Sequence, residues 1–141
     1  MTITLSDEAR QLAALFEMET EATVRDCLVD EEFDRVIILV KAGEMGKAIG
    51  AGGEHVSRVE EQIGKSIKLI EDAPTAEDFV ASALAPAAVY NVTLSENEDL
   101  LAYVEVPEED RGAAIGADGR NIEAARKLAA RHHDIDDIEL T

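Results

Sequence analysis

Hydrophobic residues first recur at helical spacing near the start of the chain. Ser6 is followed by DEARQLAALFEM, in which two acidic residues fill the first turn. Four apolar residues of this stretch share one face: Ala9, Leu12, Ala13 and Phe16. An N-cap serine, early acids and a period near 3.6 residues are the signals of an amphipathic helix. The stretch AEDFVASAL after Thr75 repeats the plan, with Asp78 placed for a capping box. The pattern therefore predicts one helix at the start of each half of the chain.

Two strands are expected after each helix, on either side of a short polar turn. We place them at 22–29 and 33–41 in the first half, and at 87–94 and 99–106 in the second. The run VIILV at 36–40 is continuously apolar, which predicts a strand in the centre of its sheet. In the second half, polar residues alternate with Ala88, Tyr90, Val92 and Leu94, the pattern of a half-buried strand. Tyr90 and Tyr103 are then expected to pack in the core or on the sheet face, which leaves no visible aromatic platform for stacking bases.

Each half continues with a short helix, a glycine-rich turn and a second helix. The turns read AIGAGGEHV at 48–56 and AIGADGRNI at 114–122. Behind each turn, three apolar residues share a helical face: Val56, Val59 and Ile63 in the first half, and Ile122, Ala125 and Ala129 in the second. A strand closes each half, KSIKLIE at 65–71 and DIDDIELT at 134–141. The second of these is less regular, and we expect its register to have shifted by one or two residues.

A shift of 66 residues superimposes the two halves without gaps through most of the middle. Matched pairs include Gly46 with Gly112, Ile49 with Ile115, Gly50 with Gly116, Gly53 with Gly119, and Val56 with Ile122. Such internal duplication predicts an α+β protein in which the order helix, strand, strand, helix, turn, helix, strand (αββααβ) occurs twice. Pro74 in EDAPT marks the joint, so we expect domains at 1–73 and 74–141. The joint is too short for a flexible linker, and we expect the domains to pack as one rigid unit.

A turn between two helices that uses glycine twice suits one kind of ligand. Glycine can take positive φ angles and lets a ligand approach the backbone without obstruction from a Cβ atom. The amides at the N-terminus of the next helix then face outward, at the positive end of the helix dipole. This geometry suits a phosphate group. For either turn alone, a tight corner without a ligand is the alternative, and the presence of two copies at matching places favours a function.

The sequences IGAGG and IGADG, each between a short helix and an amphipathic one, resemble the GXXG loops of KH domains. The αββααβ order is similar to the type II KH variety. Two such units, closely joined and covering about 5–141, resemble the RNA-binding part of NusA-family transcription factors, above all the archaeal form that consists of little more than two KH domains. The resemblance implies a binder of single-stranded RNA that acts in transcription elongation or termination, with RNA polymerase or its transcript as partner.

The resemblance also implies which residues contact RNA, because a KH loop clamps the backbone of about four nucleotides. In the first domain these are Lys47, Gly50, Ala51, Gly52, Gly53, His55 and Arg58. In the second domain they are Gly116, Ala117, Asp118, Gly119, Arg120 and Asn121. The groove for the bases would draw on Ile49, Val56, Ile115, Ile122 and the sheet edge, although we expect Ile49 and Ile115 to belong to the core.

The charge of the chain is unusual for a protein that binds RNA. Asp and Glu total 31 against 13 for Lys and Arg, a formal net charge of -18, and the acids are scattered along the whole chain. Dispersed acids with little lysine suggest a protein that works in concentrated salt, where the Debye length falls to about 3 Å and self-repulsion is weak. An ordinary acidic protein is the alternative. Glu54 and Asp118 place carboxylates at the two loops, and we expect the second loop to be the weaker clamp.

Other functions have less support in the residues. GKS at 64–66 lacks the upstream glycine of a Walker loop, and no nucleophile–base pair stands out, so we expect no enzyme activity and no cofactor. The histidines and aspartates at 132–137 are more typical of a solvated acidic edge than of a metal site. Two alternatives stay open: a KH scaffold that has lost RNA and binds a basic protein partner, and a ribosome-associated KH protein.

The remaining features indicate the setting in which the protein works. The single cysteine, Cys27, excludes an internal disulfide, and its apolar neighbours predict a buried thiol. No stretch approaches the roughly 20 apolar residues of a membrane span, and the start of the chain does not have the pattern of a secretory signal. We therefore expect a soluble, cytoplasmic monomer that does not bind membranes.

Overall fold

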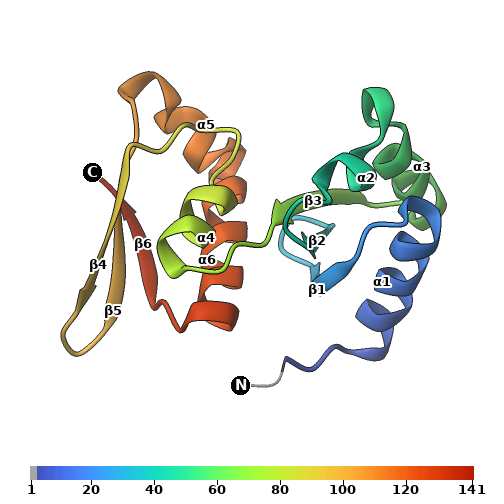
Figure 1. Ribbon diagram of the computed structural model, residues 1–141, viewed down its shortest axis with the longest axis horizontal. Helices are drawn as coiled ribbons and strands as arrows, with labels where there is room; N and C mark the ends of the chain where they lie inside the picture. Colours follow the sequence, from blue (N-terminus) through green and yellow to red (C-terminus); the bar gives the residue numbers. More distant parts are fainter. Residues whose placement is uncertain (1–2) are drawn as a thin grey trace. The chain divides into compact units, whose positions relative to one another are not determined.

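The computed structural model describes residues 3–141, which form two compact units of the same plan (Figure 1). The units divide as Met1–Asp72 and Ala73–Thr141, one residue before the expected joint. The first contains α1 (Asp7–Thr20), β1 (Val24–Asp30), β2 (Arg35–Val40), α2 (Met45–Ile49), a 3₁₀ turn (Ala51–Gly53), α3 (Glu54–Ile63) and β3 (Ser66–Glu71). The second contains α4 (Ala76–Ala83), β4 (Asn91–Glu96), β5 (Leu100–Glu105), α5 (Arg111–Ile115), a 3₁₀ turn (Ala117–Gly119), α6 (Arg120–His133) and β6 (Asp137–Leu140). A further 3₁₀ turn, Glu108–Asp110, leads into α5. The predicted αββααβ order is confirmed in both units.

Each unit has a three-stranded sheet with one antiparallel and one parallel pair. The strand orders are β1-β2-β3 and β4-β5-β6, and in each sheet the last strand pairs in parallel with the middle one. In the first unit, Phe16 of α1 and Val59 of α3 share one core with Val36, Ile38 and Val40 of β2. The helices therefore cover one face of the sheet. The strand order places the last strand of each unit at a sheet edge. All six residues of β2 are buried, as its continuous apolar run predicted for a central strand.

The starts of α1 and α4 follow the capping signals in the sequence. Ser6 Oγ accepts a hydrogen bond from the Ala9 amide at 3.1 Å, and Thr75 Oγ1 accepts one from the Asp78 amide at 3.1 Å. These hydroxyls satisfy amides that lack an intrahelical partner. Both predicted N-caps are confirmed.

Two expectations about the second unit were wrong. The strand expected at 87–94 lies at Asn91–Glu96, and the Ala88 amide before it donates to Asp110 Oδ2 at 2.7 Å instead of to a neighbouring strand. Tyr90 precedes the strand, and its side chain is 68% exposed instead of packed. Tyr103 lies in β5, half-buried and opposite Thr93 of β4.

The register of the last strand has shifted further than we expected. Val36 of β2 pairs with Ile67, and its repeat partner Ala102 of β5 pairs with Ile138. The closing strands are therefore offset by 71 residues instead of 66, a shift of five. The preceding helix accounts for four of these residues, with 10 in α3 and 14 in α6, and the connection to the strand accounts for the fifth, with residues 64–65 in the first unit and 134–136 in the second.

Cys27 of β1 is buried in the core beneath the helices, as predicted. Burial is the main cause that raises the pKa of its thiol to about 12, and the nearby carboxylates of Asp26 and Glu8 add to the rise. A thiol that stays protonated at neutral pH is a poor nucleophile. Cys27 is therefore a core residue with no reactive role.

A buried ion pair closes the β1–β2 hairpin. Arg35 Nε donates to Asp30 Oδ2 at 2.7 Å, and the two side chains are 6% and 2% exposed. The guanidinium also lies 4.9 Å from the ring centroid of Phe33. Neither charge has bulk water to solvate it, so each depends on the other.

We predict that Arg35→Met lowers the free energy of unfolding by about 3–5 kcal/mol, because it strands the Asp30 carboxylate in the interior. Urea denaturation at constant KCl measures this. Lys65→Met is the matched control: it removes the exposed Lys65–Asp34 pair at 3.8 Å in the same hairpin region and should cost less than about 1 kcal/mol. An equal loss of unfolding free energy in the two variants would show that the buried pair contributes no more to stability than the Lys65–Asp34 pair.

Candidate nucleic-acid interface

The two glycine turns have the same backbone conformation. Gly50 has φ 75° and ψ 171°, and Gly116 has φ 79° and ψ 169°. The third position is left-handed in both turns, with φ 63° at Gly52 and φ 57° at Asp118. Aspartate tolerates this region better than most residues. The second turn has therefore kept the loop geometry although it has lost one glycine.

The first glycine of each turn is required by packing. A Cβ atom on Gly50 would lie 2.5 Å from His55 Cγ, and one on Gly116 would lie 2.8 Å from Asn121 Cβ. By contrast, within residues 3–141 no heavy atom outside the immediate neighbours lies within 4 Å of a Cβ placed on Gly52, Gly53 or Gly119. One side of the loop is thus packed against the following helix, and the other side is open to a ligand.

The side chain behind each loop ties the two helices together. His55 Nδ1 lies 2.7 Å from the Lys47 carbonyl of α2, a distance that requires the proton on Nδ1 because the carbonyl can only accept. Asn121, its repeat partner, is buried and donates Nδ2 to the carbonyls of Ala114 at 3.1 Å and Leu84 at 3.2 Å. Both residues were predicted to contact RNA. The structure gives them a part in positioning the loop.

An acidic residue before each short helix anchors that helix to the segment that leads into the first strand of its unit. Glu44 Oε1 accepts the Thr23 amide at 2.6 Å in the first unit. Asp110, its repeat partner, accepts the Ala88 amide at 2.7 Å in the second. The hydrogen bond from Thr23 lowers the pKa of Glu44, and Lys47 and Lys41 nearby add to this. The short helices that carry the loops are therefore fixed at both ends.

The charged residues near the two loops differ. In the first unit, Lys47 and Arg58 are exposed on α2 and α3, and Glu54 lies 3.8 Å from His55. In the second unit, Arg120 folds back on the loop, with Nε donating to the Ala117 carbonyl at 3.0 Å and Nη2 lying 3.7 Å from Asp118 Oδ2. The carboxylate of the second loop is thus partly compensated by its own neighbour.

A groove runs from the second loop along α6 to the edge strand β6. Its volume is about 500 Å³, and its walls are Arg111, Ile115, Asp118, Gly119, Ile122, Glu123, Arg126, Glu139 and Leu140. Ile115 and its repeat partner Ile49 are each 39% exposed. Our expectation that these two belong to the core was wrong, because each is the last residue of a short helix whose buried position is taken by the preceding alanine, Ala114 or Ala48.

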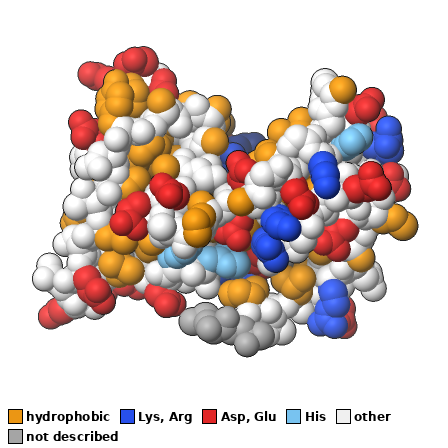
Figure 2. All heavy atoms as spheres, in the orientation of Figure 1, with side chains coloured by type: hydrophobic (Ala, Val, Ile, Leu, Met, Phe, Trp, Pro, Cys, Tyr) orange, Lys and Arg blue, Asp and Glu red, His pale blue; other side chains and the backbone are white. Residues whose placement is uncertain are grey.

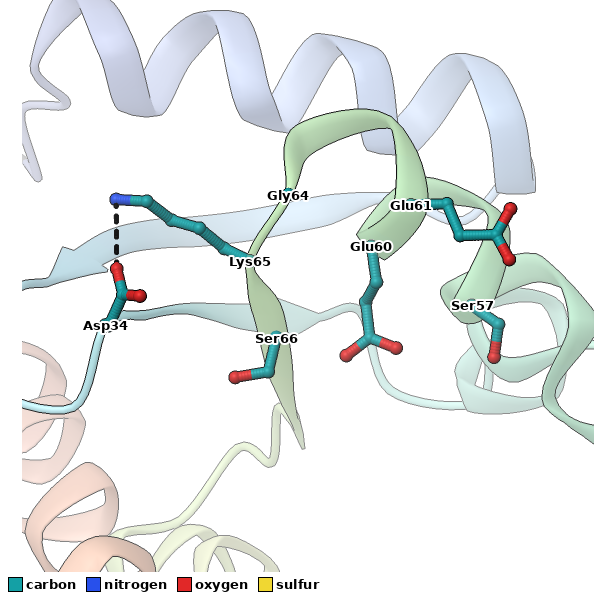
Figure 3. Close-up of a pocket in the computed structure, with 7 residues that line it drawn as sticks. All are labelled: Asp34, Ser57, Glu60, Glu61, Gly64, Lys65 and Ser66. Carbon is teal, nitrogen blue, oxygen red and sulfur yellow. Dashed lines mark ion pairs between the residues drawn. The ribbon is translucent and has the colours of Figure 1, made fainter.

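Sequence reasoning missed the polar walls of the groove. Arg111 and Arg126 were not singled out, since isolated arginines on helices usually point to solvent. Arg126 follows Ile122 by four residues on α6 and therefore lies on the same helical face, which was the one available signal. In the first unit, a hollow at the end of α3 is lined by Asp34, Ser57, Glu60, Glu61, Gly64, Lys65 and Ser66 (Figure 3).

The histidine–aspartate stretch near the C-terminus packs in a way that we did not expect. The rings of His132 and His133 lie 5.8 Å and 4.8 Å from the ring of Phe79, measured between centroids, so they pack against α4. Across residues 3–141, no group of three or more potential metal ligands comes together. In the same part of the chain, no helix is long and apolar enough to cross a membrane.

Acidic side chains are spread over the surface. On the face drawn in Figure 2, Asp and Glu lie over both units, while Lys and Arg lie mostly over the first. The sequence explains this difference, because residues 69–110 contain eleven acidic residues and no Lys or Arg. Any nucleic acid must therefore be held with few cationic contacts.

Two αββααβ units, each with a Gly-x-x-Gly loop between a short helix and a longer one and with its last strand at a sheet edge, define a tandem KH-domain protein. The KH domain family model matches residues 12–98, and the NusA-like second KH domain model matches residues 76–141.

Comparison with whole proteins shows to which family of tandem KH-domain proteins the chain belongs. The chain is 66% identical over 141 residues to the "Probable transcription termination protein NusA" of Halobacterium salinarum, with all of both chains covered. It is 57% identical over 140 residues to the protein of the same description from Halococcus morrhuae, with 99% of each covered. The crystal structure of APE1850 superimposes with a TM-score of 0.86 at 30% identity, covering 97% of this chain and 100% of that one. The chain belongs to the NusA family.

We predict that Gly50→Ala destabilises the protein by about 3 kcal/mol, because the new Cβ overlaps His55 and the backbone conformation is one that only glycine adopts readily. Gly46→Ala is the control, since this helical glycine has open space around it among the described residues and alanine there should add about 0.5–1 kcal/mol of stability. Thermal and urea unfolding measure both variants. A Gly50→Ala protein as stable as the Gly46→Ala protein would contradict the packing argument.

Proposed function

We propose that the protein binds single-stranded RNA, with each unit holding one segment of the strand between its glycine loop and its groove. The observation that carries the proposal is that the two loops have the same backbone conformation. Both adopt the same left-handed conformation, both are open on one side, and each lies at the start of a helix. Duplication of a structural corner does not require this open side, whereas a backbone clamp does.

The chemistry of the clamp follows from the loop and the helix behind it. The N-terminal ends of α3 and α6 are the positive ends of these helices, where a phosphate is favoured. The amides of Glu54 and Arg120, the first of each helix, donate to the loop carbonyls of Ala51 and Ala117 and so fix the loop against the helix start. The open side at Gly52, Gly53 and Gly119 lets the sugar–phosphate backbone come close. The exposed Ile49 and Ile115 give apolar contact to the bases beside the loop.

The acidic surface is compatible with RNA if the protein works in concentrated salt. Single-strand binding loses affinity with a log–log slope of about −0.7 for each phosphate neutralised by a cation. A protein that binds through amides and shape instead of lysine neutralises few phosphates, so its affinity for RNA falls only slightly as the salt concentration rises. Relatives from Halobacterium and Halococcus support this setting.

The role in the cell follows from the relatives. Their description as transcription termination proteins supports a part in elongation or termination, with RNA polymerase and its transcript as partners. We propose that the protein acts there as a cytoplasmic monomer and has no catalytic step of its own. A second role has one specific observation in its favour: the eleven acids without a base at 69–110 would suit a basic protein partner.

The test is a fluorescence-anisotropy titration of mixed-sequence single-stranded RNA from low to multimolar KCl. We expect wild-type binding that persists at molar salt, and in dilute buffer we expect binding at least tenfold weaker in Ala51→Asp/Gly52→Asp, because there the repulsion between the two carboxylates and the phosphate is screened least. The matched control is Ala42→Asp/Gly43→Asp, which alters the same dipeptide, with Gly43 also at positive φ (85°), in the turn before α2. Circular dichroism confirms that each variant is folded. Folded wild type that binds at no salt concentration, or a loop variant that matches the control, would refute the proposal.

Exchange of the third loop residue tests the difference between the two clamps. Asp118 shows that aspartate fits the φ of this position, so Gly52→Asp should leave the fold intact. In dilute buffer we expect Gly52→Asp to weaken RNA binding about fivefold and Asp118→Gly to strengthen it by a similar factor, since one charge about 5 Å from a phosphate in water is worth about 1 kcal/mol. In multimolar KCl the three proteins should converge. Equal affinities in dilute buffer would show that the loop carboxylate does not face the strand.

A further inference from the structure

One helix position in each unit reaches across to the backbone of the edge strand, and its charge is opposite in the two units. Glu60 of α3 and Arg126 of α6 are repeat partners, 66 residues apart. Glu60 Oε2 accepts a hydrogen bond from the Ile67 amide at 2.8 Å. Arg126 Nη2 donates to the Ile138 carbonyl at 3.0 Å. Because Ile67 and Ile138 pair with the equivalent residues of the middle strands, the two contacts are made at the same point of the fold.

The backbone groups that these two side chains contact point away from the middle strand, toward the open edge of the sheet. Successive residues of a strand direct their backbone groups alternately to the two sides. The Asp72 amide bonds the Val40 carbonyl and the Thr141 amide bonds the Val104 carbonyl, each toward the middle strand. By this alternation, the backbone N–H and C=O groups of Ile67 and Leu69 in β3 point to the open edge of the sheet. The same holds for Ile138 and Leu140 in β6. Leu140 and Arg126 are both walls of the groove of the second unit, so the charged side chain sits at the place where the edge of a base would meet the strand.

Both side chains keep hydrogen-bonding capacity beyond their contact with the strand. Ionised Glu60 is an acceptor only, and its Oε1 is not used in the contact with Ile67. Arg126 is a donor only. It gives one Nη1 proton to Glu123 Oε1 at 2.7 Å and one Nη2 proton to Ile138, and each Nη carries a second N–H. Its Nε lies 2.8 Å from Asp137 Oδ1 as an ion pair without hydrogen-bond geometry.

Each charged group is open to the groove side. In Figure 3 the carboxylate of Glu60 points between Ser57 and Ser66, beside the start of β3, and shares a hollow with them. The side chain of Arg126 is 34% exposed within the groove that begins at the second loop. A base that reaches the hollow at the end of α3 would therefore meet an acceptor, and a base that enters the groove of the second unit would meet donors.

This rests on the RNA binding proposed above. We propose that Glu60 and Arg126 set the base preference of the two grooves, the first favouring a base with an amino group at this edge and the second a base with a carbonyl. Among the pyrimidines these are cytosine, whose N4 amino group donates to Glu60, and uracil, whose O4 accepts from Arg126. The two units would then read one strand with different preferences, although their loops are alike.

Pyrimidine oligonucleotides test this, because cytidine and uridine have nearly the same shape and do not pair with each other. Four labelled RNAs are titrated against the full chain: all cytidine, all uridine, and the two block orders of cytidine and uridine. For wild type we expect one block order to bind about tenfold more tightly than either single-base RNA, since each groove then receives its preferred base. The favoured order shows the direction of the strand.

Neutral variants locate the preference. Glu60→Gln keeps an acceptor for the Ile67 amide and adds donors, so all-uridine RNA should rise to the affinity of the favoured block RNA. Arg126→Gln should do the same for all-cytidine RNA. Arg126→Lys, which keeps donors both for Ile138 and for a uracil carbonyl, should retain the wild-type preference. Glu8→Gln on the exposed surface of α1 and Lys127→Gln, one residue beyond Arg126, are the matched controls. Each makes the same charge change in the same unit outside the cavity lining, and both should behave as wild type.

The outcomes separate this inference from the proposal beneath it. Loss of discrimination in the variants but not in their controls supports it. Equal binding of all four RNAs by wild type, or variants that follow their controls, overturns it and leaves Glu60 and Arg126 as side chains that only cover the strand edge. No binding of any of the four by folded wild type overturns it together with RNA binding itself.

Discussion

The close packing of one glycine against the following helix is the constraint on which the rest of the molecule depends. At Gly50 and Gly116 the backbone passes so near His55 and Asn121 that a Cβ atom has no room. This contact directs the loop outward and places the start of the next helix beside it. The edge strand and the start of the next helix then take fixed positions around the loop, and this arrangement occurs twice.

The parts of the fold that could be predicted are those with local signals. The two N-caps, the glycine turns and the order of elements depend on residues a few positions apart, and duplication let each half confirm the other. The parts that could not be predicted depend on distant partners. The Ala88 amide, before β4, is bonded by the carboxylate of Asp110, 22 residues further along, and the register of β6 is set by four extra residues in α6 and one in the connection after it. No local pattern near Tyr90 carries that information.

The candidate site shows the same division. The loops were visible in the sequence because glycine at two fixed positions has few structural explanations. The exposed Ile49 and Ile115 were not, because an apolar residue at helical spacing usually packs inside. Glu60 and Arg126 were missed for the opposite reason, since charged residues on a helix usually face water. Their contacts with Ile67 and Ile138 are recognised as equivalent only when the edge strands are aligned by their pairing. The offset between these strands is 71 residues instead of 66, which hides the equivalence when the two halves are compared by sequence.

The net charge of -18 places a condition on any way in which this fold can hold RNA. Long-range attraction cannot bring the strand to the protein, so affinity must come from contacts within a few ångströms, where salt screens least. Backbone amides, apolar contact and single hydrogen bonds to base edges are contacts of this kind. A surface that gives up attraction to phosphate therefore depends more heavily on the bases. On this reasoning, the difference between Glu60 and Arg126 has more weight here than it would have in a basic KH protein.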